Sequence, residues 1–249
     1  MTNDMKMRDA LVDDGRLKIA INLGNAALAT RDDATGELGG VTVALANRLC
    51  AMLGCEAELI PFQGAGKVVE AATSDRWRIG FCAIDPEREA YLAFSAPYVL
   101  IEAKALVRAA SPLRSVDELD RNGIILLVAK QSAYDLYLSA NAQAMTLLRE
   151  ATPGASFEAF KSDATGADAV AGVTQSLEKA FGDDPAYRML EGTITAMGQA
   201  MVVPKRFEAV RDELNRFVED AKADGYVRRA LDRAGQNSLP VAPAQWTKK

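Results

Sequence analysis

The sequence contains no histidine among its 249 residues. This absence excludes Ser-His-Asp and Cys-His nucleophilic centres, and it excludes zinc sites that use imidazole ligands. The three cysteines, Cys50, Cys55 and Cys82, form no metal-ligand spacing, so neither a metal site nor a cofactor is predicted. An enzyme would have to rely on carboxylates, lysines or tyrosines, and we therefore predict a protein without catalytic residues.

The few cysteines also indicate little disulfide chemistry. Cys50 and Cys82 lie in apolar segments, where cysteine behaves as a small core residue. Cys55 directly follows Gly54, which reads as a helix stop. The odd number and the short spacing favour three free thiols over a Cys50–Cys55 disulfide.

Long hydrophobic runs and an excess of positive charge are lacking as well. No apolar stretch approaches the roughly 20 residues that span a bilayer, so no direct membrane insertion is predicted. The formal net charge of −5 provides no basic face for nucleic acid. With 49% hydrophobic and 25% charged residues, the composition is that of a globular chain long enough for one large domain or two lobes.

The most informative segment runs from Ile79 to Tyr98. The apolar run Ile79–Ile84 is typical of a strand buried on both faces of a parallel sheet. The turn Asp85-Pro86-Glu87-Arg88 follows at its carboxyl end, where ligands bind in open α/β sheets. An arginine there can grip a carboxylate through two parallel hydrogen bonds. The alternative is a solvated turn arginine paired with Glu87 or Glu89.

Alternating strand and helix patterns predict two β-α-β-α-β units with parallel sheets. The first comprises a strand at Lys18–Asn22, a helix with Val41, Leu45, Leu49 and Met52 inward and Gly54 at its end, a strand at Leu59–Phe62, a helix at Lys67–Ala72 and the strand Ile79–Ile84. The second comprises Ile124–Val128, Ser132–Ser139, Met145–Leu148, Ser156–Lys161, Asp168–Ala171 and Val173–Phe181. An apolar face from Phe207 to Ala221 predicts a further helix, and Gln236–Lys249 is expected to be an extended or mobile tail.

Several short motifs in this order resemble the solute-binding proteins of bacterial ABC transporters, namely family 3, the polar amino-acid-binding type. They are Leu17–Ile21, Gly36–Val41, Asp85–Arg88, the Phe-Ser-x-Pro-Tyr run at 94–98, Ser132–Tyr137, Gly166–Val170 and Gly198–Lys205. The resemblance implies the two-lobed type II periplasmic binding protein fold, an α/β fold in which each lobe is a mostly parallel sheet flanked by helices. The expected lobes are residues 1–99 plus 198–249 and residues 100–197. Two hinge crossings join them, near 98–103 and 195–199.

The resemblance also implies a monomer that closes its hinge on a small-molecule carboxylate and hands it to an ABC permease. It implies a periplasmic location. The N-terminal residues Met1–Asp9 lack the hydrophobic core of a secretory signal, so a chain whose native start is Met1 would remain in the cytoplasm. Both locations remain open at this point.

The resemblance implies that Arg88 binds the ligand carboxylate, as a clamp, in a cleft between the lobes. The expected ligand-binding residues are Arg88, Asn22, Asn25, Ala83, Ile84, Gln131, Ser132, Ala133, Thr174 and Gln175. A plain helix N-cap is the competing interpretation of Ser132.

Two departures from the family pattern bear on the ligand. The resemblance implies an acidic residue that accepts the ammonium group of the ligand, but this position is Val173 here. Lys130-Gln131 stands where a glycine is common in the family. An organic acid is therefore expected over a zwitterionic amino acid.

Two other functions fit the same resemblance. A cyclohexadienyl-dehydratase-like enzyme would need a general acid, for which only Asp85, Glu87 and Glu102 are near. A cytoplasmic ligand sensor or orphan binder would need no permease.

Overall fold

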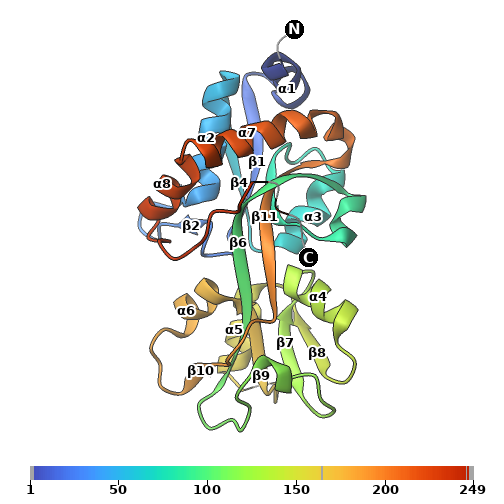
Figure 1. Ribbon diagram of the computed structural model, residues 1–249, viewed down its shortest axis with the longest axis vertical. Coiled ribbons are helices and arrows are strands. Elements are labelled where there is room, and N and C mark those ends of the chain that lie inside the picture. Colours follow the sequence, from blue (N-terminus) through green and yellow to red (C-terminus); the bar gives the residue numbers. More distant parts are fainter. Residues whose placement is uncertain (1–2, 164, 245, 247–249) are drawn as a thin grey trace. The chain divides into compact units, whose positions relative to one another are not determined.

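The computed structural model describes residues 3–163, 165–244 and 246. The chain divides into two compact units, of which the first is Met1–Leu23, Ala27–Leu100 and Gly198–Lys249. The second unit is Gly24–Ala26 and Ile101–Met197. Apart from the short segment Gly24–Ala26, the chain passes between units inside β6 (Leu92–Arg108) and again inside β11 (Thr195–Pro204), so two continuous strands make these passages (Figure 1).

In the first unit, parallel strands lie at the centre and helices follow them in sequence. The elements are α1 (Asn3–Leu11), β1 (Arg16–Asn22), β2 (Thr30–Arg31), β3 (Leu38–Gly39), α2 (Val41–Leu53), β4 (Glu56–Phe62), α3 (Ala65–Glu70) and β5 (Gly80–Ala83). β1 pairs in parallel with β4, and Ile19 forms a parallel bridge with Ile79 just before β5. β5 pairs antiparallel with β11. The predicted order of elements in this unit is confirmed.

The core of this unit is built around Trp77, which is fully buried and donates its Nε1–H to the carbonyl of Val68 at 3.1 Å. α2 contributes Leu45 and Leu49 to the interior and ends at Gly54, whose φ of 63° is the left-handed cap expected for glycine. Met52 was predicted to face inward but is 40% exposed, because Leu53 takes the buried place in the last turn.

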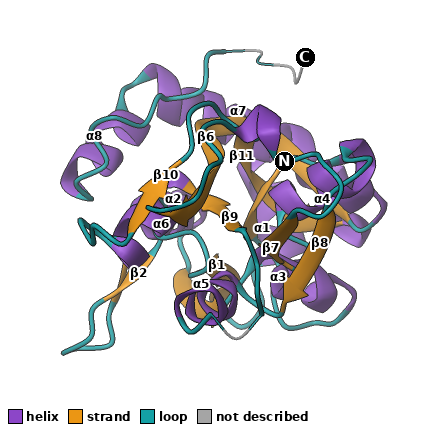
Figure 2. Cartoon of the chain, turned by 90° about the horizontal axis from the view of Figure 1, so that it is seen from below, coloured by secondary structure: helices purple, strands orange, loops and turns teal. Residues whose placement is uncertain are grey.

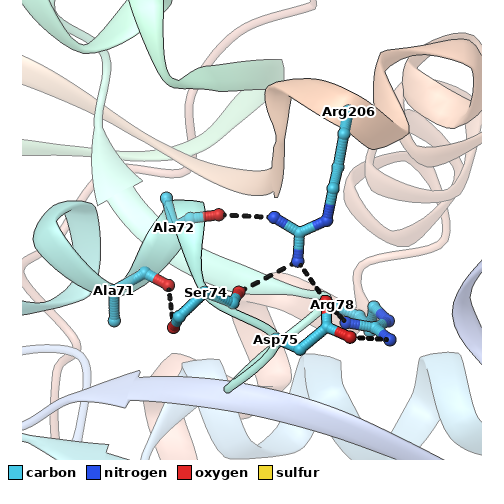
Figure 3. A network of polar contacts seen from close by, with 6 residues as sticks. All are labelled: Ala71, Ala72, Ser74, Asp75, Arg78 and Arg206. Atoms are coloured by element: carbon cyan, nitrogen blue, oxygen red, sulfur yellow. Dashed lines mark hydrogen bonds and ion pairs between the residues drawn. The ribbon is translucent and has the colours of Figure 1, made fainter.

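A polar network fixes the segment that follows β11 to the turn after α3 (Figure 3). Arg206 donates to the carbonyls of Ala72 at 2.7 Å and Ser74 at 2.9 Å, and to the Asp75 carboxylate at 2.9 Å. Arg78 donates to the same carboxylate at 2.9 Å. These hydrogen bonds lower the pKa of Asp75, with the bond from Arg78 as the main cause.

The second unit is built on a sheet with both parallel and antiparallel strand pairs. Its elements are β7 (Ile125–Ala129), α4 (Ala133–Asn141), β8 (Thr146–Glu150), α5 (Pro153–Lys161), β9 (Ala169–Val173), α6 (Thr174–Phe181) and β10 (Tyr187–Met189). β7 pairs in parallel with β8 and β9, while β6 pairs antiparallel with β9 and β10. Phe157, Phe160 and Phe181 pack edge to face in the core. Both units therefore have the predicted α/β architecture.

The C-terminal segment returns to the first unit. α7 (Arg211–Ala223) buries Leu214, Phe217, Val218 and Ala221, and α8 (Tyr226–Arg233) follows. The chain then continues as coil (Figure 2). Leu239 and Ala242 are buried, and Ala242 donates its N–H to the carbonyl of Tyr98 at 3.1 Å. Of the two predicted states of the tail, extended or mobile, residues 239–242 adopt the extended one and pack against the first unit. Residues 245 and 247–249 lie outside the described part of the chain.

Across the residues that the structure describes, none of the helices has both the length and the apolar character needed to traverse a bilayer. The same residues contain no cluster of three or more metal-ligating side chains.

Candidate functional site

Arg88 lies in a short 3₁₀ helix, Pro86–Ala90, that begins immediately after β5. Asp85 caps this helix by accepting the N–H of Glu87 at 3.0 Å, and Pro86 supplies the φ angle that a first helical position requires. The turn directs the Arg88 side chain back toward the strand, where Nη1 donates to the carbonyl of Ala83 at 3.0 Å.

The Arg88 residue is only 3% exposed. The alternative of a solvated turn arginine is therefore wrong. Its positive charge is close enough to the Cys82 thiol to oppose the rise in the pKa of Cys82 that burial causes. A permanently charged guanidinium at a strand end is suited to hold an anion, because burial strengthens its electrostatic attraction.

Asn22, Ala83 and Ile84 lie at the same edge of the first unit as Arg88. Asn22 is the last residue of β1 and Ala83 the last of β5, and the N–H of Ala20 bonds to Ile79, so the two strands are aligned in parallel. Parallel strands end at the same edge, so the candidate residues of the first unit gather at its carboxyl edge.

In the second unit, Gln131, Ser132 and Ala133 connect β7 to α4. Ser132 is the N-cap of α4, and its Oγ accepts the N–H of Asp135 at 3.1 Å. The capping interpretation of Ser132 is thus confirmed, while ligand contact by its hydroxyl group stays a prediction. Gln131 has φ of 58°, in the left-handed region that favours glycine.

The turn at Gln131 is held by two residues that the sequence analysis missed. Asp135 is 3% exposed and accepts the N–H of Gln131 at 2.8 Å and Nε–H of Arg149 at 2.9 Å. Arg149 also donates to Ser139 at 2.8 Å. The S-x-x-D spacing from Ser132 to Asp135 is a capping signal that predicts part of this arrangement, but Arg149 comes from β8 and has no local signal.

Thr174 and Gln175 open α6, directly after β9. The Thr174 hydroxyl donates to the carbonyl of Glu102 at 3.2 Å. Oε1 of Gln175 is buried and, among the described residues, meets no hydrogen-bond donor. A buried carbonyl oxygen without a donor is costly, and a ligand donor would satisfy it.

The segment Gly24–Ala26 is also part of the second unit. The N–H of Ala26 donates to the Ser176 hydroxyl at 3.2 Å, in the first turn of α6, and the neighbouring Asn25 is 5% exposed. β7 and β9 are parallel neighbours, so Gln131–Ala133 and Thr174–Gln175 lie at one carboxyl edge of this unit. Each unit therefore gathers its own half of the candidate residues.

Three solved structures illustrate how far the fold is shared. A mutant of ArgBP from T. maritima matches with a TM-score of 0.77 at 18% identity, covering 94% of this chain and 99% of that one. The amino acid ABC transporter substrate-binding protein AbpA from Streptococcus pneumoniae, bound to L-arginine, gives a TM-score of 0.77 at 19% identity and covers 93% and 99%. A cysteine-binding protein from Campylobacter jejuni gives 0.75 at 19% identity and covers 98% and 100%. These likenesses confirm the fold.

No curated protein matches the sequence. The family model for bacterial extracellular solute-binding proteins, family 3, matches residues 17–236, which is most of the chain. The chain belongs to the family 3 bacterial extracellular solute-binding proteins.

Proposed function

We propose that this protein binds a small carboxylate-bearing solute, with Arg88 as the carboxylate partner, and delivers it to an ABC transporter. The observation that carries the proposal is the buried guanidinium of Arg88 at the carboxyl end of β5. A buried positive charge favours an anionic ligand over a neutral one. The transport role is supported by the family and by structural relatives that are described as ABC transporter proteins.

The ligand contacts proposed for the first unit are Arg88, Asn22, Ala83 and Ile84. The second would supply Asn25, Gln131, Ser132, Ala133, Thr174 and Gln175. Val173, at the N-cap of α6, is apolar, and the first turn of α6 holds no acidic residue. A ligand ammonium group would meet no carboxylate there, whereas a hydroxyl donor would suit Gln175 Oε1. We therefore favour an organic acid, and a hydroxy acid in particular.

A standard L-amino acid is the second candidate. Structural relatives are described as bound to L-arginine or glutamine or as binding cysteine. Neutral groups such as Gln175 would then have to replace the acidic partner of the ammonium group.

Binding without turnover is the proposed role. The carboxylates considered as general acids are otherwise engaged: Asp85 caps the helix of Arg88, and the carboxylate of Glu102 accepts a hydrogen bond from Thr193 at 3.2 Å. Glu87 is exposed.

Titration calorimetry tests both the ligand class and the role of Arg88. The protein is unfolded and refolded to remove co-purified ligand, then titrated with dicarboxylates, hydroxy acids, 2-oxo acids and L-amino acids. We expect an organic acid to bind with a Kd in the micromolar range, and Arg88→Gln to weaken it by at least about 30-fold, since a charge-assisted bond contributes about 2 kcal/mol.

Arg31→Gln is the matched control, because Arg31 is an exposed arginine of the same unit. Its affinity should equal that of the unmodified protein, and circular dichroism should show that both variants fold. Binding of an L-amino acid with no organic acid bound would establish the second candidate. Unchanged affinity in a folded Arg88→Gln protein would refute the proposed clamp.

A further inference from the structure

The C-terminal end of α2 brings two cysteines together. The N–H of Cys55 donates to the carbonyl of Cys50 at 3.0 Å, across Gly54 in the left-handed conformation. This is the six-to-one hydrogen bond of a Schellman motif, in which the side chains at its two ends approach each other. Here both of those side chains are cysteines.

The backbone geometry permits a covalent link. The path from the Cα atom of Cys50 to the Cα atom of Cys55 consists of the carbonyl group of Cys50, the hydrogen bond of 3.0 Å and the N–Cα bond of Cys55. The two Cα atoms therefore lie within about 7 Å of each other, close to the span of a disulfide. The two thiols are close enough that Cys55 contributes to the raised pKa of Cys50.

The pair borders an open hollow of about 520 Å³ on the first unit. Beside the two cysteines, its lining includes the charged residues Asp14, Arg16 and Glu56. Cys50 is 3% exposed, whereas Cys55 is only partly buried. A small molecule that enters the hollow therefore reaches the Cys55 sulfur first.

The end of α2 is held in this geometry by α1. The Arg8 guanidinium donates to the carbonyls of Leu53 and Gly54, the latter at 2.8 Å. These contacts satisfy carbonyls that a helix end leaves open, and they keep Gly54 in its turn.

We propose that Cys50 and Cys55 are a modification site that closes to a reversible intramolecular disulfide by exchange with a small-molecule disulfide. The Cys55 thiolate attacks one sulfur of the small disulfide, forms a mixed disulfide and releases one small thiolate. Cys50 then attacks the Cys55 sulfur, its proton passes to the departing thiolate, and a second small thiol leaves. Two protein thiols are oxidised and one small disulfide is reduced to two thiols.

The order of attack follows from the surroundings of the two sulfurs. Burial, followed by the neighbouring Cys55, raises the pKa of Cys50 to about 12, so Cys50 stays protonated near neutral pH. The charged groups around the pair are Arg8 from α1, Asp14 and Arg16 from the turn into β1, and Glu56 from β4. Cys82 lies in the core on β5, where burial raises its pKa as well, and it serves as an internal control.

Peptide mapping tests the site with the full chain. Trypsin leaves Cys50 and Cys55 together in the peptide Leu49–Lys67 and Cys82 alone in Ile79–Arg88. After equilibration with oxidised glutathione and alkylation under denaturing conditions, Leu49–Lys67 should escape alkylation and weigh two hydrogen atoms less. Ile79–Arg88 should be alkylated, and dithiothreitol should restore alkylation of the first peptide.

Substitutions distinguish the first attack by Cys55 from the closing attack by Cys50. Cys50→Ala should leave a stable glutathione adduct on Cys55, and Cys55→Ser should leave Cys50 unmodified in the folded protein. Cys82→Ser should form the disulfide like the unmodified chain. Full alkylation of both cysteines after equilibration, or a glutathione adduct on Cys55 that persists in the unmodified chain, would overturn the proposal. Neither result depends on ligand binding.

Discussion

At the scale of single residues, Gln131 combines an unfavourable backbone angle with a place among the candidate ligand contacts. Its φ of 58° costs a residue with a Cβ about 1 kcal/mol relative to glycine. Glycine would adopt this angle without strain, so the strain accompanies the presence of the Gln131 side chain. Strain of this kind is often found at functional sites.

Replacing Gln131 separates its backbone cost from its side-chain role. Gln131→Gly should stabilise the ligand-free protein by about 1 kcal/mol, because glycine adopts this angle freely. Gln131→Ala, which keeps the Cβ, should leave stability nearly unchanged. If the side chain contacts the ligand, both variants should weaken binding equally, as measured by denaturant unfolding and calorimetry. A Gln131→Gly protein no more stable than Gln131→Ala would contradict the strain argument.

The sequence predicts some residues of the site better than others. Arg88 follows from local signals, since a buried strand, an Asp-Pro turn and an arginine are adjacent in the chain. The contact of Arg149 with Asp135 joins β8 to α4 and depends on tertiary packing. The left-handed angle of Gln131 has no signal in the residue itself, because non-glycine residues seldom adopt it.

At the scale of elements, the predicted strands and helices agree in order with the observed ones, and most ends differ by a few residues. Periodicity predicts an element well where one face is buried along its whole length, as in α7. It failed at the end of α2, where Met52 is 40% exposed although it lies two turns after Leu45, because the helix buries Leu53 in its last turn instead. β7 and β9 are short and largely buried, which made them detectable as apolar runs.

The turn before β8 depends on one carboxylate. Asp120 accepts the backbone N–H groups of Gln143, Ala144 and Met145 at 2.8–3.1 Å. These bonds, with that from Ala144 the largest contribution, lower the pKa of Asp120. A lowered pKa means that the ionised group stabilises the fold above its unfolded-state pKa, and that this stability is lost as pH falls through the folded-state value.

Asp120→Asn should therefore destabilise the protein at pH 7 and have little effect at acidic pH. Thermal unfolding of both proteins between pH 7 and about pH 3 measures the difference, which should shrink below the ordinary aspartate pKa of about 3.9. Asp183→Asn, at an exposed aspartate for which no such backbone bonds are observed in the described chain, is the control. A constant difference between Asp120→Asn and the unmodified protein across this range would show that its charge is not involved.

At the scale of the whole molecule, the first unit is assembled from three separate stretches of chain. The sequence predicts this discontinuity only through the family resemblance, because no local pattern indicates which distant segments pack into the same unit. The C-terminal coil shows the same limit. It is rich in proline and polar residues, yet Leu239 and Ala242 are buried because β6 offers a partner edge at Tyr98–Leu100.

The coil after α8 should therefore contribute to stability. The carbonyl of Pro240 accepts the N–H of Leu100 at 3.2 Å, and the Leu239 side chain is 4% exposed. Leu239→Ala removes a buried side chain and should cost about 2 kcal/mol, a fall in Tm of roughly 5 °C for a chain of this size. Ser238→Ala, at the exposed neighbouring position, should leave Tm unchanged. Equal Tm values for the two variants in a calorimetric scan would mean that the coil is not packed against β6 in solution, because a buried leucine cannot be truncated without cost.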